Sequence, residues 1–470
     1  MRRIALFAGI AVLILAAVLG GAYYAFVLKF SAKPPAADYP KPATALEAQK
    51  QDLDYFGKLM ALDRAFTPQA RALADKRLEE LQALPEPLPP PKFKVALLQI
   101  FALADNGHSR MSAAAPTDHA VLVEPIRVTR FSEGFFVMRA KEPYRALLGA
   151  RIEAIDGMAF EQVLARLETL RGGTESWRRE NATSLILLHD ILYGLGVVKD
   201  PARASWTLRQ TDGQINTAEL IAAPFGKRLN LPPDTRYLSP EPLKGDSPDW
   251  ISYSPASGTL PGSLSNLRNR FSLISVPDSC AVYIRLQAIM DSDEQKIAPF
   301  LETTASSLKA HPPCAAIVDL RGNGGGDYTK AWGFTHALPN LVTPGGRLYV
   351  LTDPYTFSAA ITAAAFLKEA GGDRVTIIGE PVGDRLSFHA EGGSACLPNS
   401  GLCLNFQVGK HDYEKPCQGS DCFWLNWFYP VRVKTLAPDI AIPRSFADWN
   451  QGRDGAYEAA LKAIRGSSHR

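Results

Sequence analysis

The sequence has almost no excess charge of either sign. Among its 470 residues, 51 Lys and Arg stand against 48 Asp and Glu, which gives a formal net charge of +3, and no basic stripe interrupts this balance. Nucleic-acid binding requires such a stripe to meet the phosphates, so nucleic acid is excluded as a partner. The sequence also has no internal repeat. Its 46% hydrophobic residues are enough to bury a sizeable core, which excludes general disorder.

Motifs for binding phosphate or metal are missing as well. The Gly-Lys-Ser/Thr ending of a Walker loop is absent, and the glycine run at 322–326 matches a dinucleotide fingerprint only loosely. His411, Asp412 and Glu414 lie near Cys417 and Cys422 and could form a metal site, but these cysteines have no second pair at comparable spacing and match no strong zinc pattern. We therefore expect neither a cofactor nor a metal.

Formally charged residues are absent from Ile4 to Leu28, and the run is almost wholly apolar. A span of roughly 20 such residues is what a bilayer core requires. A cleaved secretory signal has an apolar region of about 7–15 residues, and this run is longer. The sequence therefore predicts an uncleaved transmembrane anchor within residues 1–30, with a cleaved signal as the alternative.

Cysteine is missing from the N-terminal half. The last four cysteines form two close pairs, each of which could close a short loop, and the first two would then bridge neighbouring strands; in chain order the six are Cys280, Cys314, Cys396, Cys403, Cys417 and Cys422. Structural disulfides persist outside the reducing cytosol. We therefore expect an inner-membrane anchor with the folded part in the periplasm or the cell exterior, the alternative being six buried thiols.

Composition and periodicity divide the rest of the chain. A tether is expected at 31–50, then a helical cap with a histidine-bearing turn at 51–118, in which helical periodicity runs from Asp52 to Leu84. Short β-rich runs indicate a compact module at 119–228, and a Pro-, Ser- and Gly-rich stretch at 229–270 indicates an irregular connection. Strands alternate with helices over 271–470, which predicts an α/β (α+β) core with a largely parallel or mixed sheet.

Two junctions in this core suit nucleophilic catalysis. Ser358 follows a strand and precedes an alanine-rich helix, so its hydroxyl either caps that helix or stands exposed beside the N–H of Ala359, where negative charge is stabilised. The glycine run at 322–326 follows the strand at 315–320, so it either makes a tight turn or points main-chain N–H groups at an oxyanion.

A serine nucleophile needs a base and an orienting acid. His108 lies in the polar turn at 105–109 and is the first candidate base, ahead of His389 and His411. Asp412 and Glu414 are the candidate acids, because their loop lies just before the expected Cys417–Cys422 bridge.

At this point the motifs resemble those of C-terminal processing (tail-specific) peptidases and their tricorn-like relatives. The motifs that carry the resemblance occur in the family's order over residues 271–464: Asp-Leu-Arg-Gly-Asn-Gly-Gly-Gly at 319–326, Tyr-Val-Leu-Thr and Thr-Phe-Ser-Ala-Ala within 349–360, Ile-Gly-Glu at 378–380, and Ala-Pro-Asp-Ile at 437–440. The stretch Gly149–Gly157 is similar to the PDZ-like module of that family.

The resemblance implies a serine peptidase with Ser358 as nucleophile and an oxyanion hole made by the N–H groups of Ala359 and Gly325. The family's bacterial branch uses a lysine base, but residues 379–385 contain no lysine. The tricorn-like branch uses a histidine from an N-terminal Gly-His turn, which the stretch Asn106–Ser109 matches, so the resemblance assigns the base to His108. That branch's glutamate has no counterpart here, so Glu414 is taken as the acid, ahead of Asp412.

The expected partners are a peptide or protein substrate and, through the N-terminal helix, the membrane; a homo-oligomer stays open. In the PDZ-like module, an edge strand is expected to bind peptide by β-augmentation through Gly134, Phe135, Phe136 and Val137. The predicted function is a membrane-anchored extracytoplasmic serine endopeptidase that cleaves peptides or protein C-terminal tails. The alternatives are a catalytically inactive peptide-binding protein derived from the family and an acyl hydrolase of small esters.

Overall fold

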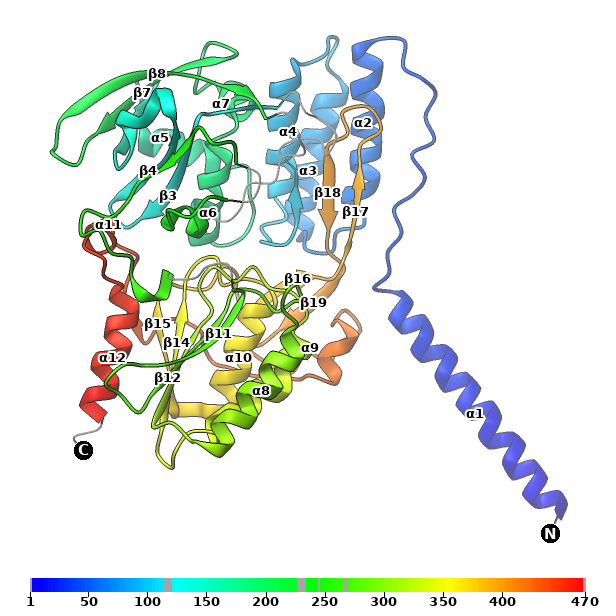
Figure 1. Cartoon of the computed structure of the whole chain (residues 1–470). Helices are drawn as coiled ribbons and strands as arrows, with labels where there is room; N and C mark the ends of the chain where they lie inside the picture. The colour runs from blue at the N-terminus through cyan, green and yellow to red at the C-terminus, as the bar shows by residue number, and fades with distance from the viewer. Residues whose placement is uncertain (1, 113–120, 226–233, 244–245, 265–268, 468–470) are drawn as a thin grey trace.

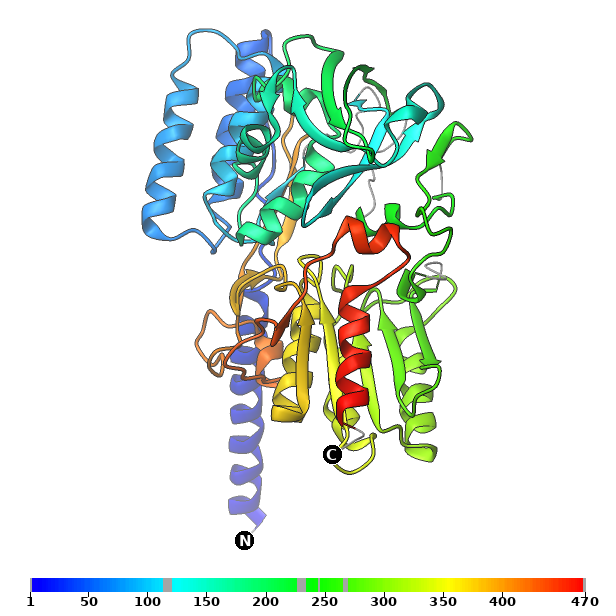
Figure 2. The same ribbon diagram turned by 90° about the vertical axis from the view of Figure 1, so that its left-hand side faces the viewer.

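The computed structural model describes residues 2–112, 121–225, 234–243, 246–264 and 269–467 (Figure 1). The first element is α1 (Arg2–Leu28), which extends away from the rest of the molecule in both views (Figures 1 and 2). Its last turn contacts the body through an aromatic ring, with Phe26 packed on Trp427 at 5.0 Å between centroids. Within the described residues, no helix is both long and apolar enough to cross a bilayer, so the expected anchor gains no support.

Three helices form the cap: α2 (Ala45–Met60), α3 (Pro68–Gln82) and α4 (Pro90–Ala102). The prediction of a single helical run from Asp52 to Leu84 is wrong, because one helix ends at Met60 and the next begins at Pro68. The restart follows a local rule: the Thr67 hydroxyl accepts a hydrogen bond from the Ala70 amide, and proline fits the first helical position because its missing N–H would have no partner there.

The module is built on a seven-stranded antiparallel sheet with short helices beside it. Its main path runs β10–β4–β5–β7–β8, with β3 on β4 and β6 on β5. The strands are β3 (Ile126–Phe131), β4 (Gly134–Lys141), β5 (Arg151–Ile155), β6 (Met158–Ala159), β7 (Arg203–Arg209), β8 (Ile215–Ile221) and β10 (Trp250–Ser252), and the helices are α5 (Phe160–Glu168), α6 (Glu175–Leu185) and α7 (His189–Gly194). β10 belongs to a stretch expected to be an irregular connection, so the sheet recruits a strand from beyond residue 228.

The expected peptide-binding edge strand is wrong. β4 begins at Gly134 and is an inner strand, since it pairs with β3 along its length, with β5 at Phe136 and with β10 near its end. Phe135, Phe136 and Val137 are buried. The outer strands of this path are β10 and β8; among the described residues β8 pairs with β7, and Ile215 and Ile221 on it are exposed.

The core sheet confirms the predicted mixed α/β architecture. Its order is β11–β12–β13–β14–β15–β20, parallel throughout except for β11. The strands are β11 (Phe271–Ser275), β12 (Val282–Leu286), β13 (Ala315–Asp319), β14 (Arg347–Thr352), β15 (Val375–Gly379) and β20 (Ile440–Ala441). Both faces are covered, as parallel sheets require: α8 (Ile297–Ala310), α9 (Thr329–Ala337) and α10 (Ala359–Gly371) pack on one, and α12 (Gly455–Ser467) on the other (Figure 2).

A long excursion from the core reaches the cap. After β15 the chain forms β16 (Ser387–Ala390), β17 (Gly393–Cys396), β18 (Cys403–Phe406) and β19 (Gly409–Asp412). β16 pairs with β19, while β17 and β18 form a sheet with β1 (Arg110–Met111) of the cap (Figure 1). This pairing brings the histidine-bearing turn at 105–109, just before β1, to the core.

The disulfide pairing predicted from the spacing is confirmed. Cys280 is bonded to Cys314, which joins the chain before β12 to the chain before β13. The other two bridges close the expected short loops, Cys396–Cys403 between β17 and β18 and Cys417–Cys422 after β19. These two bridges restrict the conformations of the excursion, one between β17 and β18 and the other in the loop after β19.

Buried charges join the module to the core. Arg130 on β3 donates to Glu180 of α6 and to Glu380, which follows β15, both at 2.8 Å. Glu133 in the turn after β3 accepts from the amides of Phe446 and Ala447 at the start of α11 (Phe446–Asn450). The module is thereby held over the carboxyl ends of the core strands.

Candidate active site

Ser358 stands at the junction between β14 and α10 in a strained backbone conformation. Its φ is 55° and its ψ is −125°, a region that L side chains rarely adopt. Its hydroxyl makes no capping hydrogen bond, so the interpretation of Ser358 as a helix cap is wrong. A strained turn that lifts a serine onto the start of a helix is the geometry of a nucleophile elbow.

The glycine run crosses directly beside Ser358. Gly325 has φ of +106°, and a Cβ placed on it would lie 2.6 Å from the Cβ of Ser358. Only glycine fits this approach. Asn323 fixes the position of the glycine run. Its buried side-chain amide donates to the Leu286 carbonyl at 2.8 Å, and its main-chain carbonyl accepts from the Phe357 amide at 2.9 Å.

The two expected oxyanion donors differ in availability. Ala359 is the first residue of α10, where an amide has no intrahelical partner, and no hydrogen bond from this amide occurs among the described residues. The Gly325 amide instead donates to Oδ1 of Asn323 at 2.9 Å. Gly325 lies where the sequence predicts, but its N–H is already engaged and could meet an oxyanion only by exchanging that bond.

His108 is fixed in its turn from two sides. Asn106 exchanges two hydrogen bonds with the main chain of His389 on β16, at 2.9 and 3.0 Å. The His108 carbonyl accepts from Nε2 of Gln407 at 2.9 Å. A Cβ on Gly107 would lie 2.7 Å from Oδ2 of Asp384, so glycine is required for this close approach.

The imidazole of His108 contacts a carboxylate that the sequence analysis did not select. Nδ1 lies 3.3 Å from Oδ2 of Asp384, whose side chain is 1% exposed. Nε2 is buried and has no hydrogen-bond partner among the described residues, which leaves it able to take a proton. Ser358 and His108 are not hydrogen-bonded here; catalytic bonds are often long before substrate binds.

Aromatic rings set the plane of this imidazole. His108 is stacked between Phe357, at 4.2 Å between centroids, and Phe388, at 5.0 Å. Trp177 of the module stacks on the far face of Phe357 at 3.9 Å. The residue immediately before Ser358 thus connects the histidine to the module, and rotation of the imidazole is restricted to its own plane.

The prediction of Glu414 as the acid is wrong, because Asp384 contacts the histidine instead. Glu414 is exposed, and its own backbone amide donates a hydrogen bond to Oδ1 of Asp412 at 3.2 Å. Asp412 is buried on β19 and faces Lys410, not His108. The carboxylate that contacts the imidazole is instead that of Asp384, at the start of the excursion. Asp384 lies in residues 379–385, the stretch in which the sequence has no lysine. An aspartate at this place was the sequence signal that could have identified the acid.

The remaining candidates play no direct part in this pair. Burial lowers the pKa of His389 to about 4, and its main chain supports Asn106. His411 is separated from His108 by the ring of Phe388 and lies 3.7 Å from Glu391. No group of three or more His, Cys, Asp or Glu side chains within the described ranges is arranged to hold a metal ion.

We expect the base to stay neutral well into the acidic range. Burial lowers the pKa of His108 below 6.5, and Asp384 opposes that shift only in part. A lowered histidine pKa means that the neutral, proton-accepting form persists as the pH falls, so kcat/KM should stay level at neutral pH and fall only below pH 6.5. A pH profile of peptide hydrolysis measures this; an acid limb centred above pH 7 would contradict it.

The fold and the site together define a three-layer α/β protein in which a strained serine starts a helix beside a histidine–aspartate pair. Solved structures share this architecture: mature CPAF complexed with lactacystin aligns with TM-score 0.56 and 13% identity, covering 90% of this chain and 98% of that one. Another structure of mature CPAF aligns with TM-score 0.55 and 14% identity, covering 89% and 97%. The chain therefore has the fold of mature CPAF, which confirms the predicted resemblance at the level of fold.

Other comparisons add little. The photosystem II D1 C-terminal processing protease aligns over 85% of this chain and 94% of that one at 13% identity, but its TM-score of 0.38 is too low to support an argument. No family model and no curated protein matches the sequence.

Proposed function

We propose that this protein is a serine peptidase that cleaves peptides or protein tails through an acyl-enzyme. The observation that carries the proposal is Ser358: its backbone is strained, its hydroxyl caps nothing, and it stands beside a glycine loop and a buried histidine–aspartate pair. Strain at a non-glycine residue persists only where the surroundings enforce it, and it concentrates at functional sites.

In the proposed reaction, Nε2 of His108 takes the proton from Ser358 Oγ as the oxygen attacks the peptide carbonyl. Asp384 accepts the Nδ1–H bond and stabilises the imidazolium that forms. The Ala359 amide, at the N-terminus of α10, stabilises the oxyanion, with Gly325 as the second donor once its bond to Asn323 is exchanged. His108 then protonates the leaving amine, and water releases the acyl group.

A fluorophosphonate probe tests the proposal. We expect the full-length protein to be labelled, and we expect the Ser358→Ala and His108→Ala variants to lose labelling. Labelling followed by cleavage of a peptide, and not only of a small ester, separates a peptidase from an acyl hydrolase. A folded protein that stays unlabelled would favour the inactive peptide-binding alternative instead.

The cellular location is part of the same proposal: an extracytoplasmic enzyme attached to the inner membrane through its N-terminal segment. Three disulfides support an oxidising compartment. The apolar side chains of α1, such as Leu15 and Leu19, are exposed in the isolated chain. Extraction of expressing cells with alkaline carbonate tests the attachment; release of the full-length chain into the soluble fraction would rule it out.

A further inference from the structure

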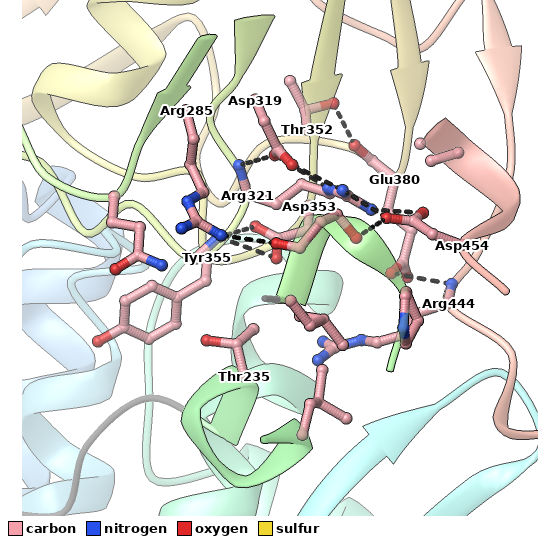
Figure 3. Close-up of a pocket in the computed structure, with 18 of the residues that line it drawn as sticks. Thr235, Arg285, Asp319, Arg321, Thr352, Asp353, Tyr355, Glu380, Arg444 and Asp454 are labelled. Atoms are coloured by element: carbon pink, nitrogen blue, oxygen red, sulfur yellow. Dashed lines mark hydrogen bonds and ion pairs between the residues drawn. The ribbon is translucent and has the colours of Figure 1, made fainter. Parts of the chain in front are cut away.

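A carboxylate that the proposed reaction does not use is buried between the segments of the candidate site. Asp353 directly follows β14, is 5% exposed and lines a cavity of about 370 Å³ at the carboxyl ends of the core strands. Figure 3 shows it among the residues of the cavity wall. Burying a carboxylate is costly unless hydrogen bonds replace those to water, so the partners of Asp353 indicate its role.

One partner of Asp353 is the glycine run. The Gly322 amide donates to the carboxylate and lies 3.1 Å from each of its two oxygens. Gly322 begins the run, and Gly325, three positions later, packs against the Cβ of Ser358. A hydrogen bond to a charged acceptor is stronger than one between neutral groups, so this bond fixes where the run starts.

A second partner is the turn that leads to Ser358. Within this turn the Thr356 amide donates to the Asp353 carbonyl at 2.9 Å, and the Asp353 amide donates to the Thr356 hydroxyl at 3.0 Å. The same hydroxyl lies 3.2 Å from Oδ1 of Asp353 and 3.0 Å from the Leu320 carbonyl. Thr356 is fully buried and precedes Ser358 by two positions. The turn at 353–356 is therefore closed on itself and connected to the chain just after β13.

The turn at 353–356 also contacts the segment that carries the acid. The Gly383 amide donates to the Thr356 carbonyl at 3.0 Å. Asp384 comes next in the chain, and its carboxylate contacts His108. This one turn thus contacts the segments that carry the glycine run, the nucleophile and the acid.

We propose that Asp353 is a positioning residue of the peptidase, whose carboxylate holds the glycine run against the turn that carries Ser358. The inference rests on the proposed peptidase function and adds to it a group that acts through its neighbours. The carboxylate reaches both sides at once, with Gly322 on one side and Thr356 on the other. Its loss releases the run from the turn, so the oxyanion donors and the nucleophile lose their fixed separation.

Other bonds hold the chain on either side of Gly322, so the fold should survive a change at Asp353. The Arg321 side chain is bonded to two carboxylates, at 2.6 and 2.8 Å (Figure 3). The Asn323 side chain donates to a main-chain carbonyl at 2.8 Å. Removing the Asp353 carboxylate therefore shifts the glycine run locally and leaves its ends in place.

Peptide hydrolysis at pH 8 tests the role. Burial raises the pKa of Asp353 to about 6, so the carboxyl is ionised at that pH. Asp353→Ala should lower kcat about 10²-fold, the effect of misplacing a catalytic group by about 1 Å, and KM should stay unchanged. Asp353→Asn keeps one acceptor oxygen for Gly322 and should recover part of the loss. A higher KM with kcat unchanged would show that Asp353 contacts the substrate, and would overturn the positioning role.

Asp52, in α2 of the cap, supplies the matched control. Its side chain is also buried and accepts from two successive amides, those of Asn399 and Ser400, at 2.8 Å each. Asp52→Ala and Asp353→Ala should both lower the melting temperature, because each leaves buried amides without an acceptor. Only the Asp353 change should lower kcat. Equal losses of kcat in the two folded variants would contradict a positioning role.

Hydrogen exchange followed by mass spectrometry measures the same role without turnover. In Asp353→Ala the segment 320–326 should exchange about tenfold faster, as the loss of a bond to a charged acceptor predicts. In Asp52→Ala that segment should be unchanged, and faster exchange should appear at residues 399 and 400. Unchanged exchange of 320–326 in Asp353→Ala would refute the inference.

The outcomes separate the inference from the function on which it rests. If the unmodified protein takes no fluorophosphonate label, the peptidase function fails, and the exchange rates still decide whether Asp353 holds the glycine run. Labelling of the unmodified protein together with a normal kcat in Asp353→Ala would refute the positioning role alone.

Discussion

Replacing Asp384 with Asn should reduce kcat by about 10⁴-fold while leaving the fold intact. The carboxylate lies 3.3 Å from Nδ1 of His108 and holds the tautomer in which Nε2 is free to accept the serine proton. An amide at this position can donate to Nδ1 and so place the ring proton on Nε2, where it blocks that transfer. Rates of hydrolysis of a fluorogenic peptide measure the loss.

The matched control is Glu414→Gln, which should keep full activity because Glu414 is exposed and the printed hydrogen bond of its amide goes to Asp412, not to His108 or Asp384. The residual activity of the Asp384 variant carries a second signature. Asp384 raises the pKa of His108, so its removal should move the acid limb of the rate profile to lower pH. Equal rates for Asp384→Asn and the unmodified protein, or a large loss in Glu414→Gln, would return the acid to the loop after β19.

Gly325→Ala should lower kcat by about 10²–10³-fold, the usual effect of losing an oxyanion donor. The added Cβ would stand 2.6 Å from the Cβ of Ser358 and 3.0 Å from the Ala359 amide, so either the serine or the donor must move. A positive φ also strains any side chain there. Single-turnover acylation by a peptide substrate measures the effect at the chemical step.

Gly213→Ala is the control for strain alone. Gly213 has φ of +88° in the turn between β7 and β8, and a Cβ on it meets nothing within 4 Å. Both variants should lose stability in a thermal melt, Gly325→Ala the more because of its added contacts, but only Gly325→Ala should lose activity. If both variants turned over at the normal rate, the glycine loop would have no part in stabilising the transition state.

Local sequence rules predicted much of the framework. Short apolar runs predicted the strand at 315–320 and the strand before Ser358, because a parallel sheet covered on both faces needs continuous apolar strands. Cysteine spacing gave all three bridges, since a bridge across five or seven positions closes easily and leaves one remaining pair. The same rules failed at Thr67 and Pro68, where a cap signal within an apparently continuous helix was missed.

The candidate site divides in the same way. Ser358 and the glycine run were predictable because each follows directly from a strand end, and His108 because its turn carries a recognisable motif. Asp384 was not selected, because its role depends on a contact between residues 276 positions apart. The strand pairing that brings the turn before β1 to the core, and the excursion that turns Glu414 outward, cannot be read from local spacing.

What the sequence by itself determined is therefore the set of local structures: the strands, the strand-to-helix junction at Ser358, the glycine loop and the disulfide pairs. The tertiary structure alone decided which acid meets His108 and that β4 is an inner strand. The physical reason is that short-range periodicity and turn chemistry act within a few residues, whereas these contacts arise from the packing of segments far apart along the chain.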